Sequence, residues 1–572
     1  MAGPGSGSEA LRKALLWGSV AFLGIGLALP LAELAVKSLS DADGGYAGFA
    51  NFAAFFGSPS LSRALWNSIY VSVAATAITV PPAFAFAYAV TRTAMPLKPV
   101  FRQLAMLPLY APSMLAGISL LYLFGKKGLI TTGFFDRLPF LSADIGLYGS
   151  TGIILAEAIL AFPPAAMILL AALDDGDARL YEAAESLGAG GPEIFWTVTI
   201  PGARHGLVSA AFVSFTMVFT DFGAPKVVGG NYPVLATDIY KHVVGQQNFN
   251  MGATVSLVMI APTLLAFLAD SWVRRRHNAA IGSRAAPLRP AKSKRRDAAG
   301  FVFCALAAGA ILAVFASAGL ASVVKSWPYN LRPGLWHYDF SHYGGGGYAS
   351  FWNSLRLAAY SAVFGTALTF GSAYLIEKTR DSRTLRRFAS LLSLVPLALP
   401  GLVIGLAYIF LFNSPSLRLF GLEIPNPLFG LYGTMALLVI CNIVHFYTVG
   451  FLTASTALRQ LDLEFEAAAE SLAIPFYTAF LRVTLPICLP AVLDIAGFYF
   501  VSSMTTVSAV IFLYTPDTAL ASVAVVNMDD AGDTAAAAAM GMLIAITNIA
   551  VKSAFDFAAR KTTAHGQAWR KR

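Results

Sequence analysis

The stretch YEAAESLGAGGPEIFWTVTIP, residues 181–201, has a near copy, EAAAESLAIPFYTAFLRVTLP, at residues 466–486. The segment AAESL is identical in both, and each residue has its counterpart 285 positions later, as Ala183 and Ala468 show. We call these two stretches the first and the second cassette. Both are polar and charged, although the sequence around each of them is strongly apolar. A cassette that occurs once in each half indicates a chain that repeats one structural plan.

The composition around the cassettes is that of a membrane protein. Of 572 residues, 57% are hydrophobic and 12% are charged, and the mean hydropathy is +0.65. Runs of about 20 apolar residues predict membrane-spanning helices, because a helix satisfies its own backbone hydrogen bonds in lipid. Twelve such runs lie at about 14–36, 66–90, 103–124, 149–172, 206–225, 249–272, 300–324, 353–376, 388–412, 430–455, 488–512 and 534–558. The sequence therefore predicts an all-α membrane protein with about twelve transmembrane helices.

The distribution of lysine and arginine predicts how the chain is oriented. If the N-terminus lies inside, most of the 40 lysines and arginines fall in inside segments, as the positive-inside rule requires. The tails 1–13 and 559–572 are then both cytoplasmic. The net charge of +9 reflects this topology and does not indicate a nucleic-acid partner, since the basic residues flank apolar runs. The first apolar run is too long for a removable signal peptide and lacks its cleavage chemistry, so we expect it to remain as a span.

The repeat extends beyond the cassettes. LWNSIYVSVAATAITVPPAFAFAYAVTRT, residues 65–93, aligns with FWNSLRLAAYSAVFGTALTFGSAYLIEKT, residues 351–379. Each half therefore has six predicted spans and one cassette, and both halves enter the membrane in the same direction, with a pathway expected between them. The predicted segments are a first half at 14–273 with its cassette loop at 173–205, a basic cytoplasmic linker at 274–299, and a second half at 300–558 with its loop at 456–486.

The cassettes carry a resemblance to a known family. The pattern E-A-A, three residues, G, and a later apolar–Pro pair resembles the cytoplasmic coupling loop of ABC importer permeases. The residues that the resemblance assigns to coupling are Glu182, Ala183, Ala184, Gly188 and Pro201 in the first cassette, and Ala468, Ala469, Glu470, Ala473 and Pro486 in the second. The second cassette departs from the pattern, because Ala467 and Ala473 stand where the family has Glu and Gly.

The resemblance covers nearly the whole chain as two fused permease halves, and it is strongest to the fused permeases grouped with ferric-iron uptake systems. It implies a type I ABC importer permease fold in a bacterial inner membrane. It also implies two ABC ATPase subunits, which would hold ATP and magnesium, and a solute-binding protein. Two segments, residues 219–253 and 504–533, resemble 2-aminoethylphosphonate permeases. We therefore expect a small polar solute, with 2-aminoethylphosphonate as first choice and ferric iron as second.

Nothing in the sequence predicts an enzyme. The glycine- and lysine-containing stretch FGKKGLITTG, residues 124–133, lacks the G-x-x-x-x-G-K-[ST] pattern of an ATP-binding loop. The seven histidines and three cysteines are scattered, without the spacing of a metal site or a catalytic triad. We expect no cofactor and no metal in this chain, and ATP hydrolysis on a separate subunit.

Polar residues inside the apolar runs are the candidates for the transport pathway, because polar groups are costly in lipid. These candidates are Glu157, Asp221, Gly223, Thr505, Thr506 and Ser508. Asp221 and Thr506 are counterparts in the repeat, and we expect both to face the pathway. The alternative is an ordinary hydrogen bond between helices, which is common for serine and threonine in membranes.

A self-contained secondary transporter with six plus six helices is the main alternative to an importer subunit. Transporters of the major facilitator superfamily usually carry a G-x-x-x-D-R-x-G-R-R loop after the second span. This chain has TRTAMPLKPVFR, residues 91–102, at that place. The missing loop favours the importer subunit.

Overall fold

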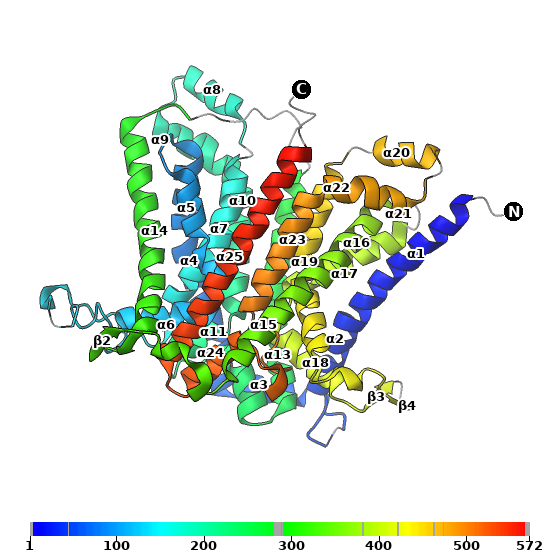
Figure 1. Cartoon of the computed structure of the whole chain (residues 1–572), viewed down its shortest axis with the longest axis horizontal. Coiled ribbons are helices and arrows are strands. Elements are labelled where there is room, and N and C mark those ends of the chain that lie inside the picture. Colours follow the sequence, from blue (N-terminus) through cyan, green and yellow to red (C-terminus); the bar gives the residue numbers. More distant parts are fainter. Residues whose placement is uncertain are drawn as a thin grey trace.

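The computed structural model describes residues 4–43, 45–135, 137–174, 176–278, 288, 290–379, 383–419, 422–461, 464–472 and 474–566. Most of these residues are helical, which confirms the all-α prediction, and two short antiparallel hairpins are the strands among them. The long helices run side by side as one bundle (Figure 1). The helices of both cassettes lie at the upper end of this bundle, as do both ends of the chain, and the hairpins lie at the opposite end.

The first half contains these elements in chain order: α1 (Pro4–Leu23), η1 (Gly24–Ala28), α2 (Leu29–Ser38), α3 (Ala50–Gly57), α4 (Pro59–Arg92), α5 (Lys98–Ala105), η2 (Leu107–Tyr110), α6 (Ser113–Phe124), η3 (Pro139–Leu141), α7 (Ser150–Asp174), α8 (Ala178–Ser186), α9 (Gly191–Ile194), η4 (Phe195–Thr199), α10 (Ile200–Thr220), α11 (Gly223–Val228), α12 (Leu235–Tyr240), η5 (Lys241–Gly245) and α13 (Phe249–Asn278).

The second half follows the same order with its own hairpins: α14 (Lys294–Val323), β1 (Val324–Ser326), β2 (Asn330–Pro333), η6 (Trp336–Tyr338), η7 (Phe340–His342), α15 (Gly347–Tyr360), η8 (Ser361–Gly365), α16 (Thr366–Lys378), α17 (Arg383–Leu394), η9 (Val395–Ala398), α18 (Gly401–Phe412), β3 (Ser416–Leu419), β4 (Leu422–Pro425), η10 (Phe429–Leu431), α19 (Met435–Arg459), α20 (Glu464–Ser471), α21 (Phe476–Ala479), η11 (Phe480–Thr484), α22 (Leu485–Ile487), α23 (Leu489–Thr505), η12 (Pro516–Thr518), α24 (Ala521–Asp530) and α25 (Thr534–Gly566).

Among the described residues, eight helices are long and apolar enough to cross a membrane, or ten if each of two bent helix pairs is one span. All twelve predicted runs coincide with helical segments, but four of them are not single straight helices. The runs predicted at 103–124 and 388–412 are each broken in the middle. The runs predicted at 206–225 and 488–512 end too late, because α10 stops at Thr220 and α23 at Thr505.

Prolines explain the two runs that break in the middle. Pro108 and Pro112 flank the end of the 3₁₀ turn η2, and Pro396 and Pro400 stand at the counterpart positions around η9. A proline lacks the N–H that the helix ladder needs and clashes with the preceding turn, so an α-helix cannot run through it unchanged. In the second half the two parts of the broken run meet at 111°.

The repeated Asn-Ser pair of α4 and α15 makes the same contacts in both halves. Ser68 Oγ accepts a hydrogen bond from the N–H of Leu235 at 2.9 Å, and Ser354 Oγ accepts one from the N–H of Ala521 at 2.8 Å. In each half the asparagine before the serine donates to the carbonyl two residues before that N–H. These bonds fix the start of α12 and of α24 against the second span of its own half, so the sequence repeat is also a structural repeat.

The two halves exchange their first helices. α14, the first helix of the second half, packs on α6 of the first half, where Ser317 Oγ donates to the carbonyl of Ser119 at 3.0 Å. In turn, α2, which continues the first span after η1, packs on α18 of the second half, and Tyr408 of α18 donates to the carbonyl of Gly26 in η1 at 2.6 Å. Each half therefore completes the core of the other.

Candidate functional site

The first cassette folds into a short helix that ends in a left-handed turn. α8 begins after Asp177, whose carboxylate accepts a hydrogen bond from the N–H of Arg179 at 3.1 Å and so caps the helix. The helix ends at Gly188, whose φ is +83°, and the N–H of Ala189 then bonds the carbonyl of Ala184 at 3.0 Å. This backbone conformation costs glycine little and other residues more, which is why a glycine ends the helix here.

The second cassette closes its helix with the same backbone bonds. In α20 the N–H of Leu472 bonds the carbonyl of Ala468 at 3.1 Å, and the N–H of Ile474 bonds the carbonyl of Ala469 at 2.9 Å. The corresponding bonds of the first cassette join residues 187 to 183 and 189 to 184 at 3.1 and 3.0 Å. Two predicted coupling residues cannot be placed in this way: Ala473 and the side chain of Glu470 lie outside the described part of the chain.

Both cassettes expose apolar side chains at counterpart positions. Leu187 is 88% exposed and Leu472 is 71% exposed. The other predicted coupling residues match in pairs where both members are described: Ala183 and Ala468 are exposed, Ala184 and Ala469 are half-buried, and Pro201 and Pro486 are exposed; Glu182 and Gly188 are exposed as well. Exposed apolar groups that gather on one element indicate a surface that another molecule covers.

An aromatic cluster anchors each cassette to the second span of its half. The ring of Phe195, the first residue of η4, lies 6.1 Å from Phe84 and 5.5 Å from Tyr88 of α4, both edge to face. In the second half Phe480 lies 4.7 Å from Tyr374 of α16, the counterpart of Tyr88. Such pairs add about 0.5–1.5 kcal/mol each beyond their buried area. These ring contacts join each cassette to the second span of its own half.

Two of the predicted pathway residues follow the ends of α10 and α23, and each packs closely against the start of a neighbouring helix. A Cβ added to Gly223 would lie 2.2 Å from the hydroxyl of Ser113, at the start of α6. A Cβ added to Gly401, at the start of α18, would lie 2.3 Å from the hydroxyl of Ser508. Gly223 and Ser508 are counterparts, and so are Ser113 and Gly401. Each half thus places one glycine opposite one serine, with the two residue types exchanged between the halves.

The structure brings Glu157 and Asp221 together. The Asp221 carboxylate accepts a hydrogen bond from the N–H of Ala224 at 2.9 Å, which caps the short helix α11. The carboxyl group of Glu157, whose side chain is 2% exposed, lies near Asp221, and one of its oxygens has no hydrogen-bond partner among the described residues. Because two carboxylates have no hydrogen to donate, they can bond each other only when one of them holds a proton.

The second half fills the corresponding positions with neutral groups. Asn442, the counterpart of Glu157, is fully buried, and neither of its side-chain polar atoms has a partner among the described residues. The hydroxyl of Thr505 donates to the carbonyl of Val501 at 3.1 Å, within its own helix. Thr506 is 7% exposed, and its carbonyl accepts a hydrogen bond from Ser522 at 2.5 Å. The Thr505 bond lies within its own helix, so it is not the hydrogen bond between helices that was the alternative to a pathway role.

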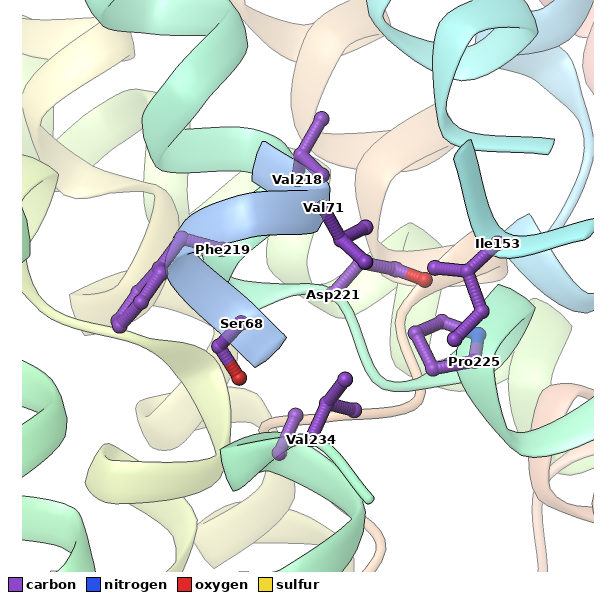
Figure 2. A pocket seen from close by; sticks show the side chains of 9 residues that line it. Ser68, Val71, Ile153, Val218, Phe219, Asp221, Pro225 and Val234 are labelled. Atoms are coloured by element: carbon purple, nitrogen blue, oxygen red, sulfur yellow. The ribbon is translucent and has the colours of Figure 1, made fainter. Parts of the chain in front are cut away.

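A small cavity lies beside Asp221 (Figure 2). Its volume of about 10 Å³ is room for one water molecule. Its lining comes from Ser68, Val71, Ile153, Val218, Phe219, Asp221, Pro225, Val234 and Ala236. The Asn-Ser anchor of α4 and the chain between α10 and α11 therefore meet at a cavity beside the Asp221 carboxylate.

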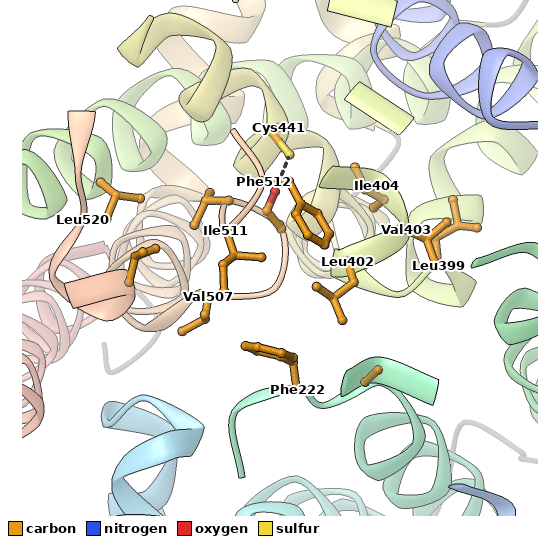
Figure 3. Close-up of a cluster of buried hydrophobic side chains, with 14 of the residues drawn as sticks. Phe222, Leu399, Leu402, Val403, Ile404, Cys441, Val507, Ile511, Phe512 and Leu520 are labelled. Carbon is orange, nitrogen blue, oxygen red and sulfur yellow. Dashed lines mark hydrogen bonds between the residues drawn. The ribbon is translucent and has the colours of Figure 1, made fainter. Parts of the chain in front are cut away.

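Aromatic and aliphatic side chains close the space between the two halves. The ring of Phe222 lies 5.1 Å from that of Tyr240, which stacks at 6.3 Å on Phe512 of the second half. Figure 3 shows Phe222 facing Phe512, with Val507 and Leu402 beside it. All but Tyr240 belong to one continuous cluster of buried apolar residues, and Tyr240 packs against it. We call Phe222, Tyr240 and Phe512 the aromatic closure.

An ion pair crosses between the halves next to the aromatic closure. Lys226 Nζ lies 2.9 Å from Asp530 Oδ1 and 5.2 Å from the centre of the Tyr240 ring. Lys226 belongs to α11 of the first half, and Asp530 is the last residue of α24 in the second. Burial and the neighbouring Asp530 raise the pKa of Asp529 to about 6. No repeat or motif in the sequence marks this ion pair or the aromatic closure, because their residues meet only across the two halves.

Two copies of one helical plan, interlocked and each carrying an exposed cassette, define the membrane subunit of a transport system. The family described as "Binding-protein-dependent transport system inner membrane component" matches residues 83–279 and 364–564, so the chain belongs to this family and contains its domain twice. It is a multi-pass membrane protein, and its relatives are transport subunits rather than enzymes.

Known relatives match both halves or one half of the chain. The ferric transport system permease protein FbpB of Actinobacillus pleuropneumoniae is 26% identical over 86% of this chain and 71% of its own length. The putative ferric transport system permease protein FbpB 1 of Haemophilus influenzae is 27% identical over 80% of this chain and 71% of its own length. The molybdenum transport system permease protein ModB of Escherichia coli is 26% identical, over 37% of this chain and 93% of its own. The resemblance to fused importer permeases of the ferric-iron type is thereby confirmed.

Proposed function

We propose that this chain is the membrane-spanning subunit of an ATP-driven importer whose two ABC ATPase subunits dock on the two cassettes. ATP and magnesium are held by those subunits. The observation that carries the proposal is the matched pair of short helices, α8 and α20, at the same end of the bundle (Figure 1). Each exposes a leucine at a counterpart position, Leu187 and Leu472. A pair of equivalent docking surfaces suits two copies of one partner.

The aromatic anchors supply a route from the docked ATPase to the pathway. Movement of the cassettes shifts Phe195 and Phe480, and these rings bear on α4 and α16. The second spans in turn hold α12 and α24 through Ser68 and Ser354. A solute that crosses between the halves has to separate Tyr240 from Phe512. In this proposal Asp221 and Thr506, beside the closure, line the opened pathway.

The proposed orientation places the cassettes and both chain ends in the cytoplasm of a bacterium, with the chain in the inner membrane. It rests on the excess of lysine and arginine in the segments at that end. The solute-binding protein then docks at the opposite end, where the two hairpins lie (Figure 1).

The proposed cargo is a small polar solute that the binding protein selects. Ferric iron is supported by two relatives whose names state ferric transport and which match most of both halves. 2-Aminoethylphosphonate is supported by the resemblance of residues 219–253 and 504–533 to permeases for that compound. The relatives named for molybdenum transport match only about the length of one half.

The test is to purify the chain with its co-encoded partners and reconstitute the complex in proteoliposomes. We expect ATP hydrolysis that rises when the loaded binding protein is added, with either ferric citrate or 2-aminoethylphosphonate as the cargo that stimulates. Deletion of both cassettes should release the ATPase. A complex that keeps its ATPase without cassettes would contradict the docking role. Uptake driven by an ion gradient without ATP would instead support a secondary transporter.

A further inference from the structure

A buried arginine ties the first cassette to the ends of two spans. Arg92, the last residue of α4, is 6% exposed. Its Nη2 donates to the carbonyl of Leu173, near the end of α7, at 2.6 Å. Its Nε donates to the hydroxyl of Tyr181 on α8 at 3.3 Å, and its guanidinium lies 5.1 Å from the centre of the Tyr181 ring. One side chain of α4 thus contacts both α7 and the cassette helix α8.

The network continues from Tyr181 to the other arm of the cassette. The Tyr181 hydroxyl donates to Thr199 Oγ1 at 3.2 Å, and Thr199 is the last residue of η4. Thr199 is 2% exposed, so this bond lies out of water. Hydrogen bonds that involve a charged group are stronger than those between neutral groups. A guanidinium with fixed donors holds several partners in one geometry, which a lysine ammonium does less well.

The chain leaves little room for this guanidinium to move. A Cβ added to Gly176, at the turn between α7 and α8, would lie 2.5 Å from Arg92 Nη2, so a larger residue there would displace the guanidinium. The second half has Lys378 at the position of Arg92 and Glu466 at the position of Tyr181. The arginine–tyrosine combination is therefore a feature of the first cassette and not of the repeat.

We propose that Arg92 is the positioning residue that couples the first cassette to α4 and α7, so that displacement of α8 by the ATPase moves both spans together. This inference rests on the proposed ATPase docking. Arg92 is too buried to contact the ATPase itself and acts through Tyr181. Loss of Arg92 should leave α8 able to bind the ATPase while its movement reaches the spans only in part.

The experiment uses the complete complex in proteoliposomes, with ferric citrate and 2-aminoethylphosphonate tested separately as cargo. Three quantities are measured: ATPase retained in a pull-down, stimulation of ATP hydrolysis by the loaded binding protein, and the distance distribution between spin labels at Ser186 on α8 and Val100 on α5. Both label sites are exposed. The control is Arg102→Gln, which removes an exposed arginine, 3.8 Å from Asp174, at the same end of the same half.

We expect Arg92→Ala to retain the ATPase, to lose about tenfold in stimulation, within the usual range of coupling between sites, and to broaden the label distances. Arg92→Lys should fall between wild type and Arg92→Ala, because lysine keeps the charge but cannot bond Leu173 and Tyr181 in the same fork. Tyr181→Phe removes only the hydroxyl, so it tests the network even if Arg92→Ala fails to fold, and it should lower stimulation in the same direction.

Stimulation and label distances in Arg92→Ala and Tyr181→Phe that equal those of Arg102→Gln would overturn the inference. A wild-type chain that retains no ATPase would instead overturn the proposed function, so the two failures are distinguishable.

Discussion

Asn548 in α25 donates a hydrogen bond from its Nδ2 to the backbone carbonyl of Tyr110, 2.8 Å away at the end of η2 in the other half. The counterpart bond runs from Thr263 in α13 to the carbonyl of Ala398 at 2.8 Å, at the end of η9. The last long helix of each half therefore supplies a hydrogen-bond donor to a backbone carbonyl of the other half. That carbonyl lies where a proline interrupts the helix, so it has no helical N–H as a partner. The halves are joined reciprocally, and neither has a complete set of backbone partners alone.

Asn548→Ala should destabilise the chain by about 1–3 kcal/mol, because the buried carbonyl of Tyr110 loses its donor. Asn548 is fully buried, so water cannot easily replace it. Thr547→Ala is the control, since the Thr547 hydroxyl bonds only the carbonyl of Leu543 in its own helix, at 2.8 Å. Thermal unfolding in detergent should give a lower midpoint for Asn548→Ala than for Thr547→Ala. Equal midpoints would show that the bond between the halves contributes nothing.

The repeat in the sequence predicted much of this fold. It placed the cassettes at matched positions, and the apolar runs located each long helix, because burial in lipid leaves an unmistakable composition. The two runs that end too late were wrong at one end for a local reason. In the first half, the Asp221 carboxylate caps a new helix from inside an apolar stretch, and hydropathy does not register a cap.

Contacts between residues far apart in the sequence could not be predicted from one sequence. The contact of Glu157 with Asp221 joins residues that were candidates separately, and nothing in their spacing placed them together. Lys226 and Asp530 are 2.9 Å apart although about 300 positions separate them. The aromatic rings Phe84, Tyr88 and Phe195 have counterparts in the repeat, so a closer comparison of the two halves could have found the anchors.

Gly188→Ala should weaken association of the ATPase with the first cassette. With φ at +83°, an alanine is strained by about 1–2 kcal/mol, although the space around the residue is open. The strain is relieved by unwinding the end of α8, which moves Leu187. Gly190→Ala is the control because its φ is −75°. A pull-down at equal expression should retain up to about tenfold less ATPase for Gly188→Ala, and equal retention would refute this role of the turn.

Gly223→Ala should disturb the break after α10, and a swap should repair it. The added Cβ would lie 2.2 Å from the Ser113 hydroxyl, and overpacking of this kind costs about 1–3 kcal/mol. The double substitution Ser113→Gly with Gly223→Ser recreates the arrangement of Gly401 and Ser508 in the second half. We expect its midpoint of thermal unfolding to lie above that of Gly223→Ala. A double variant as unstable as the single one would show that the contact with residue 113 is not the reason why residue 223 has to be a glycine.

Asp529, next to the ion pair between the halves, should make the closed arrangement sensitive to pH. Burial raises the pKa of Asp529 to about 6, with Asp530, Lys226 and the phenol of Tyr122 as the facing groups. Because this pKa is raised, the protonated Asp529 stabilises the closed form at low pH, and that stability is lost as pH rises through about 6. The unfolding midpoint of wild type should therefore fall more between pH 5 and 7 than that of Asp529→Asn. The same fall in both proteins would assign the effect to other groups.

Substitutions of Glu157 and Asp221 distinguish a structural role of each residue from a role in the transport pathway. Glu157 and Asp221 can bond each other only when one of them holds a proton, so Glu157→Gln should keep the two side chains together, because the amide can donate to the Asp221 carboxylate. Glu157→Leu removes the donor and should destabilise the break after α10 by about 1–3 kcal/mol. Asp221→Asn keeps the size of the residue and an oxygen for the N–H of Ala224, but removes the charge beside the small cavity.

In proteoliposome uptake we expect Glu157→Gln to stay close to wild type and Asp221→Asn to lose uptake while its assembly with the ATPase stays intact. That pattern assigns the charge to Asp221 and a holding role to Glu157. Loss of uptake in Glu157→Gln, with an unchanged unfolding midpoint, would mean that Glu157 is ionised when it meets the solute. Normal uptake in Asp221→Asn would leave Asp221 as the cap of α11 and remove it from the pathway.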